Sequence, residues 1–134
     1  TWSIGSNTSL VEFVELMQFS DVVINLSSTI TLDAVLFDTP VICLNFNYLP
    51  DSEWNAAHMH HKANHYRPIV ESGAVEFPND MQELIRGIQA AIRDPGDKSK
   101  MRRRLVDRMM PNLQTSNLIT QAVEKAIRES KELN

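Results

Sequence analysis

The stretch D-V-V-I-N-L-S-S-T-I-T-L-D-A, residues 21–34, decides the fold of this chain. It opens with Val22 to Ile24, a continuous apolar run typical of a strand that is covered on both faces, and therefore of a parallel sheet. From Ile30 onward the apolar spacing predicts a helix, which ends at Thr39-Pro40 because proline disfavours helix in the residue before it. A second buried strand, Val41 to Phe46, follows directly. Strand, helix and strand predict a right-handed βαβ unit and hence an α/β fold.

Helical patterns flank this unit on both sides. Ser9 and Glu12 form a capping box for a helix that runs to about Phe19. After the second strand we expect a loop with a short helix over 47–64, a short helix over residues 66–71 and a brief strand over 74–77. Three amphipathic helices then follow: one starts at the capping box Asn79 to Gln82, one carries Met101, Leu105 and Met109 on its core side, and one carries Leu118, Ile119, Ala122, Val123, Ala126 and Ile127. The fold class is a Rossmann-like parallel sheet with flanking helices, ending in amphipathic helices.

Composition limits the functions that are open to the chain. Its 134 residues are 43% hydrophobic and 22% charged, which fits one compact domain spanning residues 1–134. The formal net charge of -4 argues against nucleic acid as a partner.

The single cysteine, Cys43, excludes an intrachain disulfide, favours a reducing compartment and is expected to be buried and inert. No apolar run reaches the length of a membrane span and no signal peptide opens the chain, so a cytoplasmic location is expected. Because the chain begins at Thr1 without methionine, we expect a piece of a longer protein.

Four hydroxyl side chains follow the first strand: Ser27, Ser28, Thr29 and Thr31. Ligands of doubly wound sheets bind at the carboxyl ends of the strands, and a helix that starts there offers unpaired amide hydrogens to an anion. About three such bonds could hold a diphosphate at micromolar to millimolar concentration. The alternative is that these side chains only cap the helix, although a cap needs one residue. Thr31 could instead bond back to helix carbonyls, and Asp33 is favourable in a first helical turn in any protein.

The pattern from Asp21 to Leu44 resembles the nucleotide-binding segment in the C-terminal lobe of GT-B glycosyltransferases and their relatives. These relatives are lipid-linked N-acetylglucosaminyltransferases, UDP-N-acetylglucosamine 2-epimerases and CDP-glycerol glycerophosphotransferases. In them, a strand ending in small and hydroxyl residues meets a helix whose amides hold the donor diphosphate, and an acidic residue seven positions before a G-x-P proline binds the ribose. The segments H-Y-R-P-I-V-E-S-G-A-V and N-D-M-Q-E-L-I-R-G-I-Q-A-A-I-R-D-P resemble later parts of these enzymes.

This resemblance implies roles for particular residues. Ser27, Ser28 and Thr29 fall on the diphosphate loop, and Asp33 lies seven positions before Pro40, where the ribose is held. The families usually have Glu in place of Asp33 and Gly in place of Asp38, so the turn before Pro40 must be built differently here. The chain would be the nucleotide-diphosphate-binding portion of a transferase, inactive alone, because the N-terminal lobe that commonly supplies the acceptor site and general base is missing. The resemblance identifies no catalytic residue.

The histidines His58, His60, His61 and His65 lie within eight residues. His61 and His65 have helical spacing that could place two imidazoles on one face, but a zinc site wants a third ligand, and a solvated surface explains the cluster better. The resemblance places His65 and Arg67 near the cleft, where a cation could neutralise a leaving diphosphate. We therefore expect no metal and no cofactor, with activity independent of divalent cations.

The segment K-S-K-M-R-R-R, residues 98–104, gathers much of the positive charge of an acidic protein. A solvated helix face explains it well. A functional alternative is peripheral contact with anionic lipid at the inner face of a membrane, as suits an enzyme of surface glycan or polymer synthesis. The cations that would make this contact are Lys98, Lys100, Arg102, Arg103 and Arg104.

Two alternatives to a transferase stay open for the chain. One is a non-catalytic α/β binding or interaction module, and the other is an epimerase-type relative.

Overall fold

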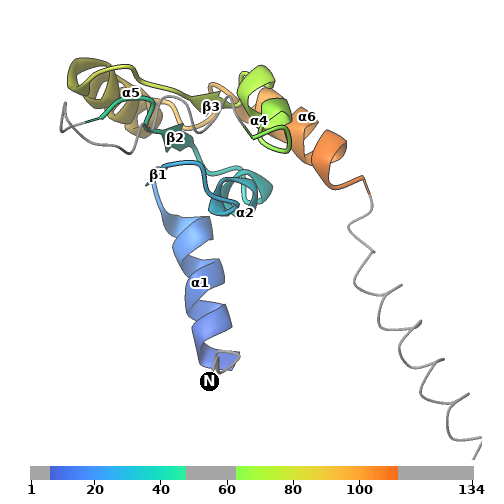
Figure 1. The fold of residues 1–134 in the computed structure, drawn as a ribbon. Helices are drawn as coiled ribbons and strands as arrows, with labels where there is room; N and C mark the ends of the chain where they lie inside the picture. The colour runs from blue at the N-terminus through green and yellow to red at the C-terminus, as the bar shows by residue number, and fades with distance from the viewer. Residues whose placement is uncertain (1–6, 48–62, 112–134) are drawn as a thin grey trace, which may run out of the picture.

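The computed structural model of the chain describes residues 7–47 and 63–111. Three short strands form one parallel sheet in the order β1-β2-β3: β1 (Val23–Asn25), β2 (Val41–Cys43) and β3 (Val75–Glu76) (Figure 1). The α/β prediction is confirmed, and the arrangement is Rossmann-like. The strand β2 ends at Cys43 rather than at the predicted Phe46, although the amide of Asn45 still donates to Pro78 O at 3.0 Å.

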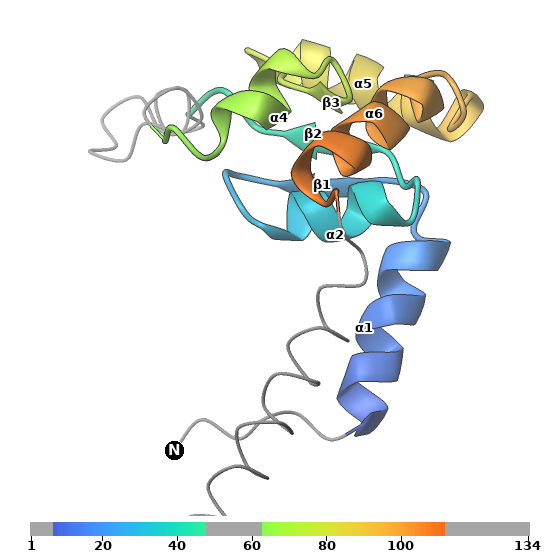
Figure 2. The ribbon, with the colours of Figure 1, turned by 90° about the vertical axis from the view of Figure 1, so that its right-hand side faces the viewer.

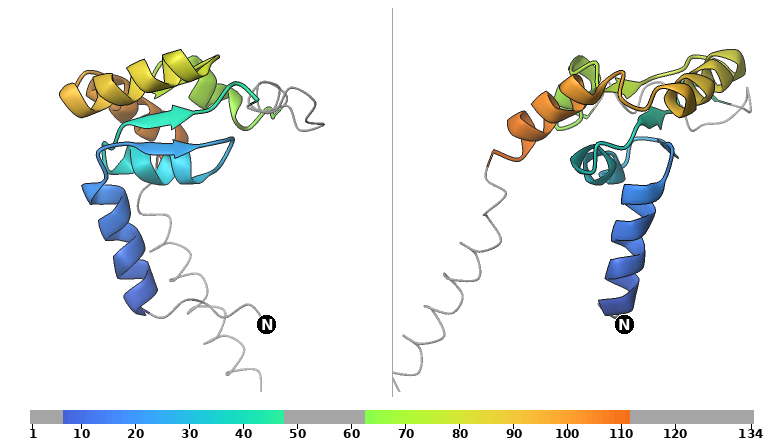
Figure 3. Two further views of the ribbon diagram at one scale, coloured as in Figure 1. Left: turned by 90° about the vertical axis from the view of Figure 1, so that its left-hand side faces the viewer. Right: turned by 180° about the vertical axis from the view of Figure 1, so that it is seen from behind.

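Helices cover both faces of this sheet. On one face lie α2 (Ile30–Leu36), α4 (Arg67–Glu71) and α6 (Ser99–Met109), of which α2 and α6 pack against each other (Figure 2). On the other face lies α5 (Met81–Arg93), which packs against β2 (Figure 3). Both connections between neighbouring strands, through α2 and through α4, therefore run over the same face.

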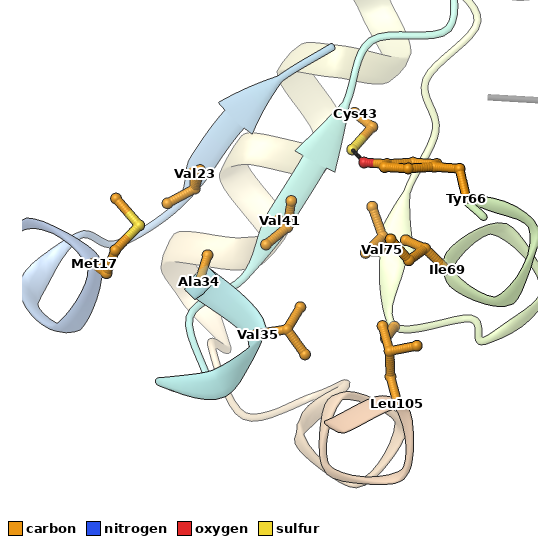
Figure 4. Close-up of a cluster of buried hydrophobic side chains, with 11 residues drawn as sticks. Met17, Val23, Ala34, Val35, Val41, Cys43, Tyr66, Ile69, Val75 and Leu105 are labelled. Carbon is orange, nitrogen blue, oxygen red and sulfur yellow. Dashed lines mark hydrogen bonds between the residues drawn. The ribbon is translucent and has the colours of Figure 1, made fainter. Parts of the chain in front are cut away.

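The core lies between the sheet and the α2, α4 and α6 side. Val35, Ile69, Val75 and Leu105 meet there from three helices and a strand (Figure 4). On the opposite face, a Cβ added at Gly87 would lie 3.3 Å from Cδ1 of Ile42. The missing side chain at residue 87 lets α5 lie close to the sheet.

The helix α1 (Asn7–Phe19) begins two residues before the predicted cap at Ser9, which therefore lies inside the helix. Figures 1 and 2 show α1 projecting from the rest of the described chain. Near its C-terminal end, Met17 is buried and its carbonyl accepts a hydrogen bond from Thr39 Oγ1 at 2.6 Å. This end of α1 is thereby fixed beside α2 and the start of β2.

The capping box of α5 is one residue later than predicted. Asp80 is the N-cap, and its Oδ1 accepts the amide hydrogen of Glu83 at 2.7 Å. Glu83 Oε2 in turn accepts the amide of Asn79 at 2.8 Å. The pattern is D-x-x-E rather than the predicted N-x-x-Q, because an ionised carboxylate is the stronger acceptor at both positions.

The core side of α6 also differs from the prediction. Leu105 is buried and Met109 packs against the core, but Met101 is exposed. The residue that takes its place inside is Arg102, which is 2% exposed. Its Nε donates to Asp38 Oδ1 at 2.7 Å and its Nη2 donates to Pro95 O at 2.5 Å. Arg102 is therefore a structural ion-pair partner and is not available to a membrane surface.

Among the residues that the structure describes, no helix has the length and apolarity of a membrane span. The predicted short helix after β2 and the predicted last helix, over 118–127, lie outside the described residues.

Candidate functional site

The serine turn, which we define as residues 27–29, lies where the sequence predicted it. β1 ends at Asn25 and α2 begins at Ile30, so the turn joins the carboxyl end of a parallel strand to a helix. Ser27 and Ser28 are partly exposed and Thr29 is exposed. The three side chains therefore stand at the edge of the sheet where ligands bind in doubly wound folds.

Four amide hydrogens of this region already have acceptors inside the chain. The amide of Ser28 donates to Leu26 O at 3.0 Å, and that of Ile30 donates to Ser28 Oγ at 3.4 Å. The remaining two bonds run from Thr31 N to Ser28 O at 3.1 Å and from Leu32 N to Thr29 O at 2.9 Å. The expectation of a row of bare amides is therefore wrong for these residues. A ligand at the serine turn would be bound mainly through hydroxyl groups.

A polar network lies beneath the serine turn and fills its inner side. Thr31 is fully buried, and its Oγ1 lies 2.7 Å from the Tyr66 hydroxyl oxygen. The same Oγ1 is 3.1 and 3.3 Å from the two side-chain heteroatoms of Asn25. Tyr66 also donates to Ser28 O at 3.5 Å, and Cys43 Sγ lies 3.3 Å from its hydroxyl (Figure 4). The prediction that Thr31 lines a cleft is wrong, because its hydroxyl is used inside the core.

Burial sets the acidity of two groups in this network. Burial raises the pKa of the Cys43 thiol, and hydrogen bonds from Tyr66 and Thr31 offset that shift only in part. Burial also raises the pKa of the Tyr66 phenol, and the hydrogen bond with Cys43 raises it further. Both groups are therefore protonated at neutral pH, and the thiol is not a nucleophile. This agrees with the expectation of a buried, inert cysteine.

Asp33 lies in the first turn of α2 and is half-buried. No hydrogen bond or ion pair engages its carboxylate within the described parts of the chain. A carboxylate near the N-terminus of a helix is favoured by the helix dipole whatever its role. A partly accessible carboxylate in the first turn after the serine turn is also what a pair of ribose hydroxyls could bind.

Tyr66, which lies between His65 and Arg67, contacts the serine turn at Ser28 O. The ring of His65 is exposed and stands edge-on to Tyr66, with the ring centroids 6.4 Å apart. Arg67 is exposed and its Nε donates to Glu71 Oε1 at 2.6 Å, one helical turn away. The hydrogen bond from Arg67 lowers the pKa of the Glu71 carboxyl. The segment that was predicted to lie near the cleft therefore contacts the serine turn through Tyr66, and the roles of His65 and Arg67 stay predictions.

Asn25 and Tyr66 are the residues that sequence reasoning missed. Asn25 interrupts the apolar run of β1, and a polar side chain at the end of a buried strand signals a buried hydrogen-bonding role. Tyr66 carries a weaker signal, since an aromatic residue before a short helix has many uses. Its distance of 35 residues from Thr31 hides their contact from any local pattern.

The five cations of the basic segment lie in different environments in the structure. Lys98 forms an ion pair with Glu76. Arg102 is buried against Asp38, whereas Lys100, Arg103 and Arg104 are exposed. Only these last three of the five predicted cations are free to meet an anionic surface.

Cavities and metal ligands give no further support to a site at the serine turn. A groove of about 440 Å³ lies along α5 and is lined by Ile42, Phe77, Arg86 and Gly87 among others, and a smaller cavity of about 50 Å³ adjoins Arg102. Neither touches residues 27–29.

Within 7–47 and 63–111, no group of three His, Cys, Asp or Glu side chains could hold a metal ion. The predicted pairing of His61 with His65 lies partly outside these ranges.

Comparison of the chain with family models, with curated proteins and with solved structures found no match.

Proposed function

We propose that this chain is the donor-binding portion of a GT-B-type transferase, a cytoplasmic enzyme of surface glycan or polymer synthesis that uses a nucleotide-sugar or nucleotide-alcohol diphosphate. The observation that carries the proposal is the serine turn at the carboxyl end of β1, followed within one helical turn by the carboxylate of Asp33, which has no partner among the described residues. The two features are the ones that the resemblance assigns to the diphosphate and to the ribose.

The chemistry of the serine turn fits phosphate oxygens. The hydroxyl groups of Ser27 and Thr29 donate hydrogen bonds to a charged oxygen, each worth about 1.5–3 kcal/mol before the cost of ordering the ligand. With the amides of Ser28, Ile30, Thr31 and Leu32 used internally, two or three hydroxyl bonds support millimolar rather than micromolar affinity for a diphosphate alone. The ribose and base must supply the rest.

The described sheet contains no reversal of strand order. The strands progress in one direction from β1 to β3, with α2 and α4 on one face. Ligands of doubly wound sheets bind where the strand order reverses. On this proposal a further strand, supplied by the early part of the same lobe, pairs with the free edge of β1 and creates the reversal next to the serine turn. On this proposal the isolated chain binds the donor weakly and has no activity.

The test is a titration of the full, ¹⁵N-labelled chain with UDP, CDP and GDP, followed by NMR. The proposal predicts saturable shifts of the amide signals of residues 27–33 at millimolar nucleotide, unchanged by a chelator. Ser27→Ala and Thr29→Val should each weaken the response, while Ser99→Ala, a hydroxyl deletion on α6, should leave it unchanged. Signals that stay fixed with all three nucleotides, or that move as much when Ser27→Ala and Thr29→Val are combined as in the wild type, would contradict it.

A second candidate function is a non-catalytic interaction module. It is favoured by the filled inner side of the serine turn and by the exposed apolar side chains of α1 and α5. On this view, the serines and threonines serve the fold and the functional surface lies on the helices. Absence of nucleotide binding together with association through those helices would favour it.

A further inference from the structure

A closed set of four hydrogen bonds, which we call the hydrogen-bond ring, lies directly beneath the serine turn. Asn25 Nδ2 donates to Thr31 Oγ1 at 3.1 Å, and the amide of Ser28 donates to Asn25 Oδ1 at 3.4 Å. Tyr66 completes the ring, because its hydroxyl lies 2.7 Å from Thr31 Oγ1 and donates to Ser28 O at 3.5 Å. One side-chain amide and two hydroxyl groups therefore link the amide nitrogen of Ser28 to its carbonyl oxygen.

The donors and acceptors of the hydrogen-bond ring follow one another in one direction. A carbonyl oxygen carries no hydrogen, so the Tyr66 hydroxyl is the donor to Ser28 O. Since its one hydrogen is then used, the Thr31 hydroxyl supplies the hydrogen of the 2.7 Å bond between Thr31 and Tyr66. Thr31 Oγ1 in turn accepts from Asn25 Nδ2. Hydrogen bonds arranged head to tail polarise one another, which strengthens the whole set.

Three separate elements anchor the hydrogen-bond ring in the core. Asn25 is the last residue of β1, Thr31 lies in the first turn of α2, and Tyr66 immediately precedes α4. Thr31 is 0% exposed and Tyr66 is 2% exposed. Tyr66 belongs to the core cluster, and Figure 4 shows its hydroxyl directed toward Cys43 at the end of β2. The ring is therefore supported by packed elements rather than by the turn itself.

The backbone of Ser28 is held from the inside at both of its polar groups. Its amide hydrogen is shared between Leu26 O at 3.0 Å and Asn25 Oδ1. Its carbonyl oxygen accepts from the amide of Thr31 at 3.1 Å as well as from Tyr66. All three residues of the serine turn are nevertheless at least partly exposed. A ligand that binds to a turn held in this way loses less conformational entropy than one that must first order the turn.

We propose that Asn25, Thr31 and Tyr66 are positioning residues of the serine turn. Their hydrogen-bond ring fixes the peptide groups of Ser28 and thereby presets the hydroxyl groups of residues 27–29 for the phosphate oxygens of a nucleoside diphosphate. Since Thr31 and Tyr66 are buried, they act on a ligand only through the conformation of the turn. The inference rests on the proposed function for the identity of the ligand, whereas the presetting of the turn is a property of the chain alone.

Amide hydrogen exchange of the full, ¹⁵N-labelled chain without ligand tests the presetting. Tyr66→Phe removes two bonds of the ring and keeps the aromatic packing, so the amides of Ser28 and Thr31 should exchange about two- to tenfold faster. The matched control is Thr39→Val, which removes a buried hydroxyl that donates to Met17 O at 2.6 Å near the start of β2. This control should leave the exchange of both amides unchanged. Equal acceleration by the two variants would overturn the inference, since it would report only a loss of global stability.

Titration with UDP, CDP and GDP, followed by NMR, tests the consequence for the ligand. Tyr66→Phe and Thr31→Val should each weaken binding about two- to tenfold, the effect of one lost neutral hydrogen bond. Thr31→Ser keeps the hydroxyl and should restore most of the affinity, while Thr39→Val should leave the affinity unchanged. Wild-type affinity in both Tyr66→Phe and Thr31→Val overturns the inference and leaves the proposed function in place. A wild-type chain that binds none of the three nucleotides contradicts the proposed function instead, and the exchange measurement then decides whether the ring presets the turn.

Discussion

The guanidinium of Arg102 lies 2.7 Å from the carboxylate of Asp38, across 64 residues of sequence. Asp38 has φ of +60°, in the left-handed region, and occupies the place where the resembling enzymes have glycine. Its second oxygen accepts a hydrogen bond from Ser99 at 2.7 Å. Asp38 therefore adopts a strained backbone conformation in the turn between α2 and β2, and its carboxylate binds two residues near the start of α6.

Removal of Arg102 tests this role. Arg102→Leu leaves the Asp38 carboxylate with Ser99 alone and removes the bond to Pro95 O. Breaking a buried ion pair costs about 3–5 kcal/mol, and since the Asp38 side chain is half exposed, we expect about 2 kcal/mol in the free energy of unfolding by urea. The exposed neighbour Arg103→Leu should change it by under about 0.5 kcal/mol. Equal effects of the two changes would show that the ion pair does not stabilise the fold.

The Asp38 pair should also make stability depend on pH. Burial alone would raise the pKa of this carboxyl, but the hydrogen bonds from Ser99 and Arg102 and the nearby arginine charges lower it overall. The folded state therefore releases this proton more readily than the unfolded state, whose pKa is about 3.9. The stabilisation is present above that value and is lost as the pH falls through the folded value. The stability difference between wild type and Asp38→Asn should be constant from about pH 5 to 7 and shrink below about pH 4. A difference that grows on acidification would contradict this assignment.

The bond between Thr31 and Tyr66 should show energetic coupling. Thr31→Val and Tyr66→Phe keep the side-chain shape and each should cost about 1–2 kcal/mol of unfolding free energy. The double variant should be less destabilised than the sum by about 1 kcal/mol, because one hydrogen bond cannot be lost twice. Thr31→Ser keeps the hydroxyl and should recover most of the bond. Strictly additive single effects would mean that the two hydroxyls do not interact.

Cys43 should resist modification in the folded protein. Its thiol is buried and its raised pKa keeps it protonated, so alkylation at pH 8 should be at least about 100-fold slower in native protein than in urea. Tyr66→Ala, which opens the space beside the sulfur, should speed the reaction. Rapid labelling of native wild type would show that the core beneath the serine turn is accessible.

The path of the chain from residue 21 to residue 43 could be predicted from the sequence, because strand, turn and helix are encoded there by neighbouring residues. The continuous apolar runs around Ile24 and Ile42 predict parallel strands covered on both faces. This is confirmed for β2, which is buried throughout, but Ile24 of β1 is 44% exposed. The helix α2 ends at Leu36, before the predicted stop at Thr39-Pro40.

A capping box was correctly predicted at the start of α5, but the N-cap is Asp80 rather than the predicted Asn79. The sequence did not decide between them because Asn and Asp are both good N-cap residues.

The role of Arg102 could not be predicted in this way. In a run of basic residues, the sequence predicts that every side chain is exposed to solvent. Arg102 differs from its neighbours only because folding brings the carboxylate of Asp38 close to it. The same holds for Tyr66, whose partner Thr31 precedes it by 35 residues. Local periodicity reports which face of a helix is apolar, but it carries no information on a distant partner that makes a charged residue acceptable in the core.

The most direct test of the transferase proposal measures whether Asp33 recognises a ribose. Isothermal titration of the full chain should give tighter binding of UDP than of 2′-deoxy-UDP, by about tenfold for one lost hydrogen bond to a charged group. Asp33→Asn should remove this preference, while Asp21→Asn, a change of an exposed carboxylate before β1, should keep it. Equal affinity for the two nucleotides in wild type, or no binding of either at about 1 mM, would contradict the proposal.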